Sequence, residues 1–102
     1  MKLLFVCSGG MSSQIVVDAL QAEAKKEAME LDVCAIGSNG FEEKIKEGFD
    51  AAMVAPQIRH RYKELKQMAD EAGVPCDLIE PFNYSPLGSK KLLLQLKKLI
   101  NL

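Results

Sequence analysis

The chain has 102 residues, of which 48% are hydrophobic and 26% charged, and its formal net charge is -1. This length allows one small domain with a single core but not a two-domain enzyme. Because there is no basic excess to grip phosphates, we expect no nucleic-acid partner. No apolar stretch reaches the length of a membrane span and the first residues lack the pattern of a signal peptide, so we expect neither.

Apolar runs and helical patterns alternate along the chain. Residues 2–6 form a continuous apolar run typical of a buried parallel strand, and residues 12–30 carry Ile15, Ala19 and Leu20 at helical spacing. The same reasoning predicts further strands at 33–36, 50–55 and 76–79 and further helices at 41–47, 57–72 and 87–100. Four strands alternating with four helices predict a single α/β domain with a four-stranded parallel sheet, order 2-1-3-4, covered by helices on both faces.

The three cysteines, Cys7, Cys34 and Cys76, are widely spaced and form no CxxC pair. This pattern argues against a disulfide framework and a zinc site, and it indicates free thiols in a reducing cytoplasm. A cysteine among apolar residues is often only a buried small hydrophobe, and we assign Cys34 and Cys76, inside predicted strands, to that class. Cys7 differs because the residues after it are those that a phosphate cradle needs.

The stretch VCSGGMSSQI places Cys7 at the end of the first apolar run and directly before a small polar loop. In open parallel sheets, ligands bind beyond the carboxyl ends of the strands, at the point where the strand order reverses. Cys7 lies at the carboxyl end of the first predicted strand, next to that point. Gly9 and Gly10 let successive amides turn inward as an anion nest, and Ser12 or Ser13 can cap the following helix. The positive end of that helix favours a thiolate, so the pattern predicts a reactive cysteine. The loop holds no cluster of Asp, Glu and His, so we expect neither a metal nor another cofactor.

Three segments together resemble the IIB component of the bacterial sugar phosphotransferase system: VCSGGMSSQIVV, APQIRH after the third strand and EPFNYSPLG after the fourth. The similarity is to the lactose/N,N'-diacetylchitobiose (cellobiose-like) family and covers essentially the whole chain, which implies one IIB domain over residues 1–102. Such a protein accepts a phosphoryl group from a phosphohistidine on a IIA partner and passes it to a sugar bound by the membrane component IIC. The resemblance implies a β-linked disaccharide such as cellobiose, chitobiose or lactose, and a monomer that meets the membrane through IIC.

The resemblance also assigns roles to individual residues. Cys7 matches the cysteine that the family phosphorylates. Tyr84 matches a tyrosine usual after the fourth strand, although the family's Tyr-Gly pair is Tyr84-Ser85 here. The residues that match the family's phosphate loop are Ser8, Gly9, Gly10, Met11, Ser12, Ser13 and Gln14.

Two other functions remain open on the residues alone. A low-molecular-weight tyrosine phosphatase shares the expected architecture and a cysteine loop, but it needs an arginine six residues after the cysteine to clamp phosphate. That position is Ser13 here, and Glu80-Pro81 stands where that family has an Asp before a Pro. In a non-catalytic interaction module, alkylation of the thiol would change nothing.

Several residues near the expected site have two readings. Pro56 and Gln57 either start a helix or frame a docking surface around the cysteine, since they leave the third strand at the same edge. Met11 either offers an adaptable contact to partners or packs against the core. His60, between two arginines early in the third predicted helix, is read as a solvated residue, because the resemblance places the phosphohistidine on IIA.

Overall fold

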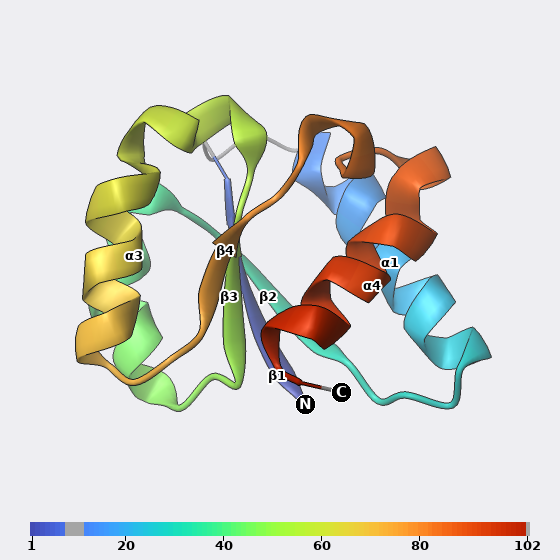
Figure 1. The fold of residues 1–102 in the computed structure, drawn as a ribbon, viewed down its shortest axis with the longest axis horizontal. Coiled ribbons are helices and arrows are strands. Elements are labelled where there is room, and N and C mark those ends of the chain that lie inside the picture. The colour runs from blue at the N-terminus through green and yellow to red at the C-terminus, as the bar shows by residue number, and fades with distance from the viewer. Residues whose placement is uncertain (8–11, 102) are drawn as a thin grey trace.

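The chain folds into a four-stranded parallel sheet with helices packed on both of its faces (Figure 1). This computed structural model describes residues 1–7 and 12–101, and its strand order is β2-β1-β3-β4. The strands are β1 (Lys2–Cys7), β2 (Asp32–Gly37), β3 (Ala51–Val54) and β4 (Cys76–Leu78). The helices are α1 (Ser12–Lys26), α2 (Phe41–Lys44), α3 (Tyr62–Glu71) and α4 (Ser89–Leu99). Short 3-10 turns are η1 (Ser38–Gly40), η2 (Ile45–Glu47), η3 (Pro56–Arg61), η4 (Pro81–Asn83) and η5 (Pro86–Gly88). The predicted α/β class, parallel pairing and strand order are confirmed.

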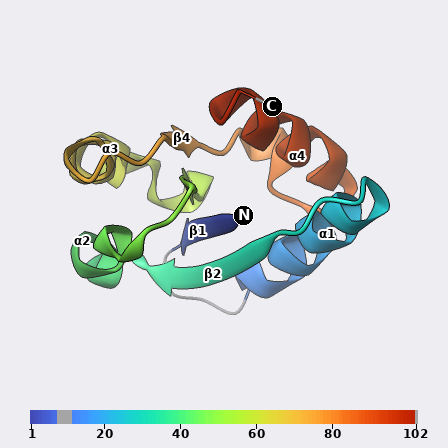
Figure 2. The same ribbon diagram turned by 90° about the horizontal axis from the view of Figure 1, so that it is seen from below.

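Alternate residues of the central strand β1 supply two separate cores. Leu3 and Phe5 pack with residues of α1 and α4, whereas Leu4 and Val6 pack with residues of α2 and α3. Successive side chains of a strand point to opposite faces, so a continuous apolar run can fill both layers at once. Figure 2 shows the two helix pairs on opposite sides of the sheet. β1 is therefore buried from both faces, and it pairs with β2 along one edge and β3 along the other.

The first helix is shorter than the predicted range of 12–30. α1 ends at Lys26, and the chain then turns at Ala28, which has a left-handed φ of 57°. The amide of Met29 donates to the carbonyl of Ala24 at 2.9 Å, and the amide of Ala28 donates to that of Lys25 at 3.0 Å. These two bonds form a Schellman motif. Glycine usually occupies the left-handed position, so an alanine there gives no stop signal in the sequence.

The predicted helix at 57–72 is divided into η3 and α3. The break lies at Ile58, whose φ of -114° and ψ of 28° are not helical and whose side chain is buried in the core with Val54 and Leu65. In the same way the predicted helix at 41–47 is α2 followed by η2, and Gly48 ends it with a φ of 88°. The last helix begins at Ser89 after η5, two residues later than predicted. The predicted strand limits differ from the observed ones by one residue at one or both ends.

Side chains bond several outward-facing backbone groups of β4, which is an edge strand. The hydroxyl of Tyr62 donates to the carbonyl of Cys76 at 3.4 Å, and Nε2 of Gln95 donates to the carbonyl of Leu78 at 2.7 Å. The amide of Leu78 donates to Oδ1 of Asp77 at 2.9 Å. These bonds interrupt the row of donors and acceptors that an edge strand would otherwise offer to another strand.

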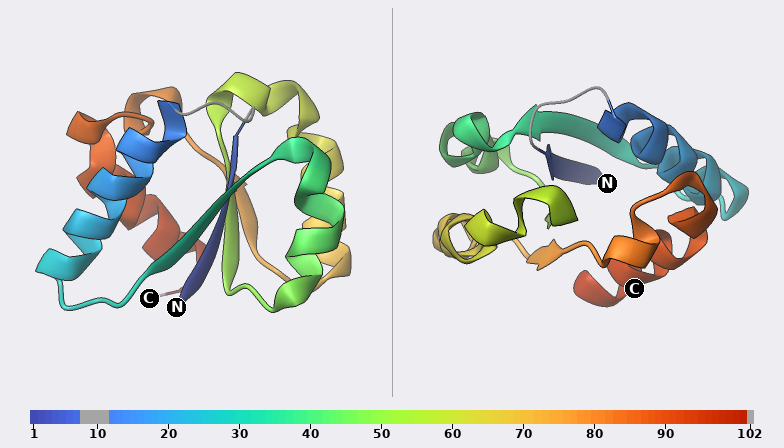
Figure 3. Two further views of the ribbon diagram at one scale, coloured as in Figure 1. Left: turned by 180° about the vertical axis from the view of Figure 1, so that it is seen from behind. Right: turned by 90° about the horizontal axis from the view of Figure 1, so that it is seen from above.

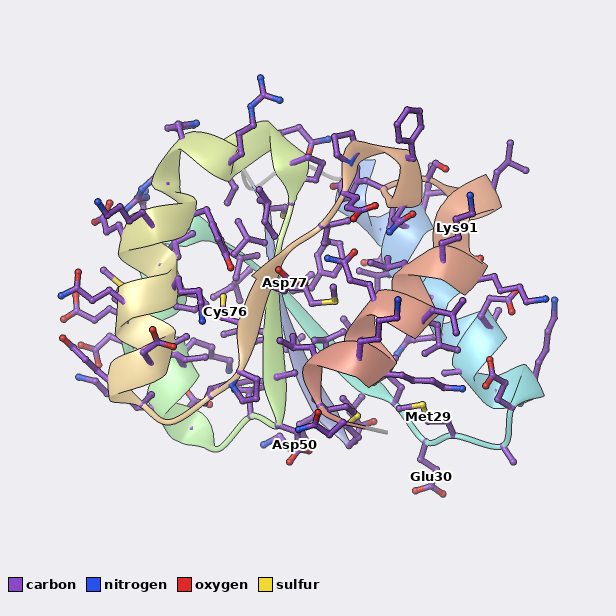
Figure 4. The ribbon with its side chains drawn as sticks, in the orientation of Figure 1. Met29, Glu30, Asp50, Cys76, Asp77 and Lys91 are labelled. Carbon is purple, nitrogen blue, oxygen red and sulfur yellow. The ribbon has the colours of Figure 1, made fainter. Side chains whose placement is uncertain are left out.

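Cys34 and Cys76 contribute to packing, as the sequence predicts. Both are free thiols; Cys76 is buried, and Cys34 is half-buried against the same core. Burial raises the pKa of the Cys76 thiol to about 12, so this thiol is protonated at neutral pH and is a poor nucleophile. In Figure 4 the side chains of Cys76 and Asp77 point to opposite faces of β4.

We predict that Cys76→Ala makes stability less sensitive to alkaline pH. The folded-state pKa of about 12 is raised from an ordinary 9.0, so the stability that the protonated thiol contributes is complete below pH 9.0 and is lost as the pH rises toward 12. Over that window the wild type should lose up to about 1.4 kcal/mol per pH unit from this group. Urea denaturation at several pH values measures the slope, with Cys34→Ala as the control. Equal slopes in wild type and Cys76→Ala would contradict the assignment.

Candidate functional site

Cys7 is the last residue of β1 and lies where the strand order reverses. β1 pairs with β2 up to the Cys7–Gly37 pair, and on its other side the amide of Ala55 donates to the carbonyl of Val6 at 2.8 Å. The chain leaves β1 through α1 on one face and leaves β2 through α2 on the other. The right-hand view of Figure 3 looks onto this end, which we call the carboxyl edge. Cys7 ends the first strand at the point where the strand order reverses, as predicted. In open α/β sheets, ligands bind at this point.

The thiol of Cys7 is nearly covered by the protein. Its side chain is 5% exposed, and Sγ donates a hydrogen bond to the carbonyl of Ile36 at 3.5 Å. Four residues separate Cys7 from Ser12, the first residue of α1. α1 has no acidic residue in its first turn and has Lys25 and Lys26 in its last turn. Its positive N-terminal end is therefore not compensated by a carboxylate of that turn.

The predicted phosphate loop is described only in part. Ser8, Gly9, Gly10 and Met11 lie outside the described residues, as do the side chains of Ser12 and Ser13. The backbone of Ser12 and Ser13 forms the start of α1. Gln14 lies in the first turn of α1, where Nε2 donates to Oδ1 of Asp18 at 2.8 Å.

An open depression of about 690 Å³ adjoins the ends of β3 and β4 at the carboxyl edge. Three residues with predicted site contacts, Pro56, Gln57 and Tyr84, line this depression together. Among the described residues its lining is Pro56, Gln57, Arg59, His60, Pro81 and Tyr84. The sequence patterns do not predict Arg59 and Pro81 as site residues, and they predict His60 only as a solvated residue. A useful signal is that Pro56 and Pro81 each begin a 3-10 turn after one of two neighbouring parallel strands.

Tyr84 is connected to the strand that carries the thiol. Its ring stacks on that of Phe5, with centroids 6.0 Å apart and an interplanar angle of 24°. Phe5 lies two residues before Cys7, so the two side chains leave β1 on the same face. The tyrosine after the fourth strand is therefore held on the face of β1 from which the side chain of Cys7 also leaves.

A buried polar network holds the 81–88 segment in place. Asn83 is 5% exposed, and its Nδ2 donates to Oε1 of Gln95 on α4 at 3.1 Å. Nε2 of Gln95 donates to Oδ2 of Asp77 at 2.8 Å and to the carbonyl of Leu78 at 2.7 Å. A Cβ at Gly88 would lie 2.5 Å from the carbonyl oxygen of Phe82, so only glycine lets η5 approach η4 this closely. The depression therefore has a rigid wall on the β4 side.

No metal site is seen among the described residues, which contain no group of three or more His, Cys, Asp or Glu side chains placed to bind an ion. The helices in the same part of the chain are all too short or too polar to cross a membrane.

We predict that Gln95→Leu destabilises the fold by about 2 kcal/mol, because it leaves buried Asn83 and the carbonyl of Leu78 without their partner. Urea denaturation measures the loss. Gln67→Leu, on the exposed side of α3, is the matched control and should change stability by less than about 0.5 kcal/mol. Equal effects of the two substitutions would show that the network contributes nothing.

The known proteins that this chain resembles are IIB components of the phosphotransferase system, or contain one. The family profile "PTS system, Lactose/Cellobiose specific IIB subunit" matches residues 2–95. The oligo-beta-mannoside-specific EIIB component of Bacillus subtilis is 28% identical over 90 residues, which are 88% of this chain and 86% of that protein. The lactose-specific EIICB component of Streptococcus mutans is 27% identical over 83 residues, 81% of this chain but 14% of that longer protein. The solution structure of the cellobiose-specific IIB component of Borrelia burgdorferi has a TM-score of 0.77 at 28% identity, covering 99% of this chain and 92% of that one.

Proposed function

Because the chain belongs to the lactose/cellobiose-specific IIB family of the phosphotransferase system, a family of phosphotransferases, we propose that Cys7 carries the phosphoryl group. The observation that supports this most strongly is the position of the thiol. It ends the central strand at the switch point of the sheet, and four residues separate it from the N-terminus of α1. Cys34 lies in the middle of β2 and Cys76 at the start of β4, so neither stands at the carboxyl end of a strand.

The start of α1 suits a phosphorylated sulfur atom. The first N–H groups of a helix have no partner within the helix, and together with the helix dipole they attract an anion. α1 is long enough to supply this field and has no carboxylate in its first turn to compete for it. We assign the remainder of the phosphate-binding loop to residues Ser8 to Gln14, with Ser12 and Ser13 at the helix start.

The proposed reaction moves one phosphoryl group in two balanced steps. The sulfur of Cys7 attacks phosphorus on a IIA phosphohistidine, the N–P bond breaks as the S–P bond forms, and the freed imidazole nitrogen gains the proton that the thiol gives up. In the second step a sugar hydroxyl oxygen attacks the same phosphorus. The S–P bond breaks, and the proton of the hydroxyl restores the thiol. Neither step consumes an oxidant, a reductant or a further co-reactant.

Docking of the partners at the carboxyl edge is supported by the position of the thiol. Cys7 is the last residue of β1 at this edge, and Pro56, Gln57 and Tyr84 line the neighbouring depression. We propose that IIA and then IIC contact this same face, and that a docked partner also keeps water from the phosphorus. Membership of the family implies both partners. The lactose-specific EIICB component also supports IIC as a partner, because the part that matches this chain is 14% of a longer protein whose name includes the IIC component.

We also propose a class of sugar, an oligomeric state and a cellular compartment for this protein. The relatives named above are specific for oligo-beta-mannoside, lactose and cellobiose. We propose a β-linked disaccharide such as cellobiose, chitobiose or lactose, selected by IIC. Residues 1–102 act as one IIB domain that is monomeric between encounters, works in the cytoplasm and has no nucleic-acid partner.

We predict that incubation with phosphoenolpyruvate, the general phosphotransfer proteins and a IIA component adds one phosphoryl group to Cys7. Intact mass followed by peptide fragmentation locates it. Cys7→Ser should abolish the addition, because an alcohol is a much poorer nucleophile than a thiolate near neutral pH. Cys34→Ala and Cys76→Ala should retain it. Phosphate on His60 or on another cysteine would overturn the assignment.

A further prediction is that isolated phospho-Cys7 persists, also with a chelator present, and discharges when IIC and sugar are added. No arginine or lysine occurs from Cys7 to Gln14, so the loop lacks the guanidinium that stabilises attack by water in a phosphatase. The decay of the phosphoprotein and the turnover of an aryl phosphate measure the difference. Rapid aryl phosphate turnover that depends on Cys7 and Glu80 would favour the phosphatase alternative instead.

A further inference from the structure

Two large apolar side chains project into solvent at the carboxyl edge. Phe82 on η4 is 87% exposed, and Leu87 on η5 is 99% exposed; together we call them the apolar tip. Ile15 on α1 is 61% exposed, and α1 lies against η5. Single exposed apolar residues are normal on a protein surface, but these three lie on elements that contact one another.

The backbone under the apolar tip is held firmly. η4 and η5 pack so closely at Gly88 that no Cβ fits there, and the amide of Gly88 also donates to Oγ of Ser85 at 3.1 Å. Asn83, between the two apolar residues, is bonded to Gln95. These contacts hold the backbone that carries the tip, so a partner that contacts it does not have to order the segment first.

The segment that carries the apolar tip has more lysines than acidic residues. Lys90 and Lys91 follow η5 at the start of α4 and are exposed, and Glu80 is the one acidic residue in the sequence 79–91. Figure 4 shows Lys91 at the upper end of α4, whereas Glu30 and Asp50 lie at the opposite end of the molecule. On the other side of the carboxyl edge, Arg59 and His60 line the depression. An apolar centre flanked by lysines is electrostatically complementary to an anionic surface.

We propose that the apolar tip and the Lys90–Lys91 pair contact the anionic headgroup layer of the membrane while Cys7 faces IIC. This rests on the proposed function, because delivery to a membrane-embedded acceptor turns the carboxyl edge toward the bilayer. Aromatic and leucine side chains beside lysines are typical of surfaces that bind at the headgroup level. Cytoplasmic loops of membrane proteins carry an excess of Lys and Arg, so a lysine pair is better matched to anionic lipid than to those loops.

The contact is expected to be weak alone and effective in combination. Each lysine near an anionic surface strengthens binding about fivefold at moderate salt. Contact through both lipid and IIC makes the second encounter intramolecular, which raises the occupancy of the docked state without a tight lipid site. Weak lipid contact also lets the protein leave to meet IIA.

Vesicle sedimentation of the isolated protein tests the inference. Wild type should bind vesicles of phosphatidylcholine with about one third phosphatidylglycerol and should bind pure phosphatidylcholine on the order of tenfold less. Phe82→Ser with Leu87→Ser, and separately Lys90→Gln with Lys91→Gln, should each weaken binding about tenfold or more. Circular dichroism confirms that the variants are folded.

Matched controls remove the same chemistry elsewhere. Leu94→Ser removes an exposed leucine in the middle of α4, and Lys25→Gln with Lys26→Gln removes two charges from the far end of α1. Both should bind vesicles as wild type does. Absence of wild-type binding, or equal losses in the controls, overturns the inference.

The vesicle experiment and the phosphorylation experiment distinguish failure of the lipid contact from failure of the proposed function. A protein that is phosphorylated on Cys7 but ignores vesicles disproves only the lipid contact. If Phe82→Ser with Leu87→Ser slows transfer to IIC in neutral detergent while wild type ignores vesicles, the apolar tip is a protein-docking surface and the lipid proposal is wrong. Vesicle binding without Cys7 phosphorylation supports the lipid contact and contradicts the proposed function.

Discussion

Burial of β1 between two strands and two helix layers is the constraint on which the rest of the structure depends. Its apolar side chains fill both cores, and hydrogen bonds to β2 and β3 fix both of its edges. A strand held on four sides cannot shift its register without moving every side chain to the wrong face. The position of Cys7 is therefore set by the whole sheet, which makes a small domain a precise holder for one thiol.

In the proposed function, this placement divides the work between the protein and its partners. The chain would supply a sulfur atom and the start of α1, while the imidazole and the sugar hydroxyl would come with IIA and IIC. The surface around Cys7 would then have to be complementary to two different proteins in turn. Short turns on a fixed sheet edge, such as η3 and η4, suit this need because they present side chains without obstructing the thiol.

Much of the architecture could be predicted because it depends on local signals. Alternating apolar runs and helical patterns gave the strand order, and the exit of the first strand located Cys7. The break at Ile58 could not be predicted, because core burial of one side chain outweighs helical propensity there. The polar network was also missed, since Asn83, Gln95 and Asp77 meet only after the sheet and α4 have packed. The depression beside Tyr84 likewise requires two strands that are adjacent in space.

Gln95 has a second consequence through the edge strand β4. The same side chain that bonds Asn83 also occupies the carbonyl of Leu78, while Tyr62 occupies that of Cys76. Loss of Gln95 would therefore free the segment beside the site and uncover an edge that can recruit strands from other copies. Gln95 therefore couples the protection of this edge to the order of the segment beside the candidate site.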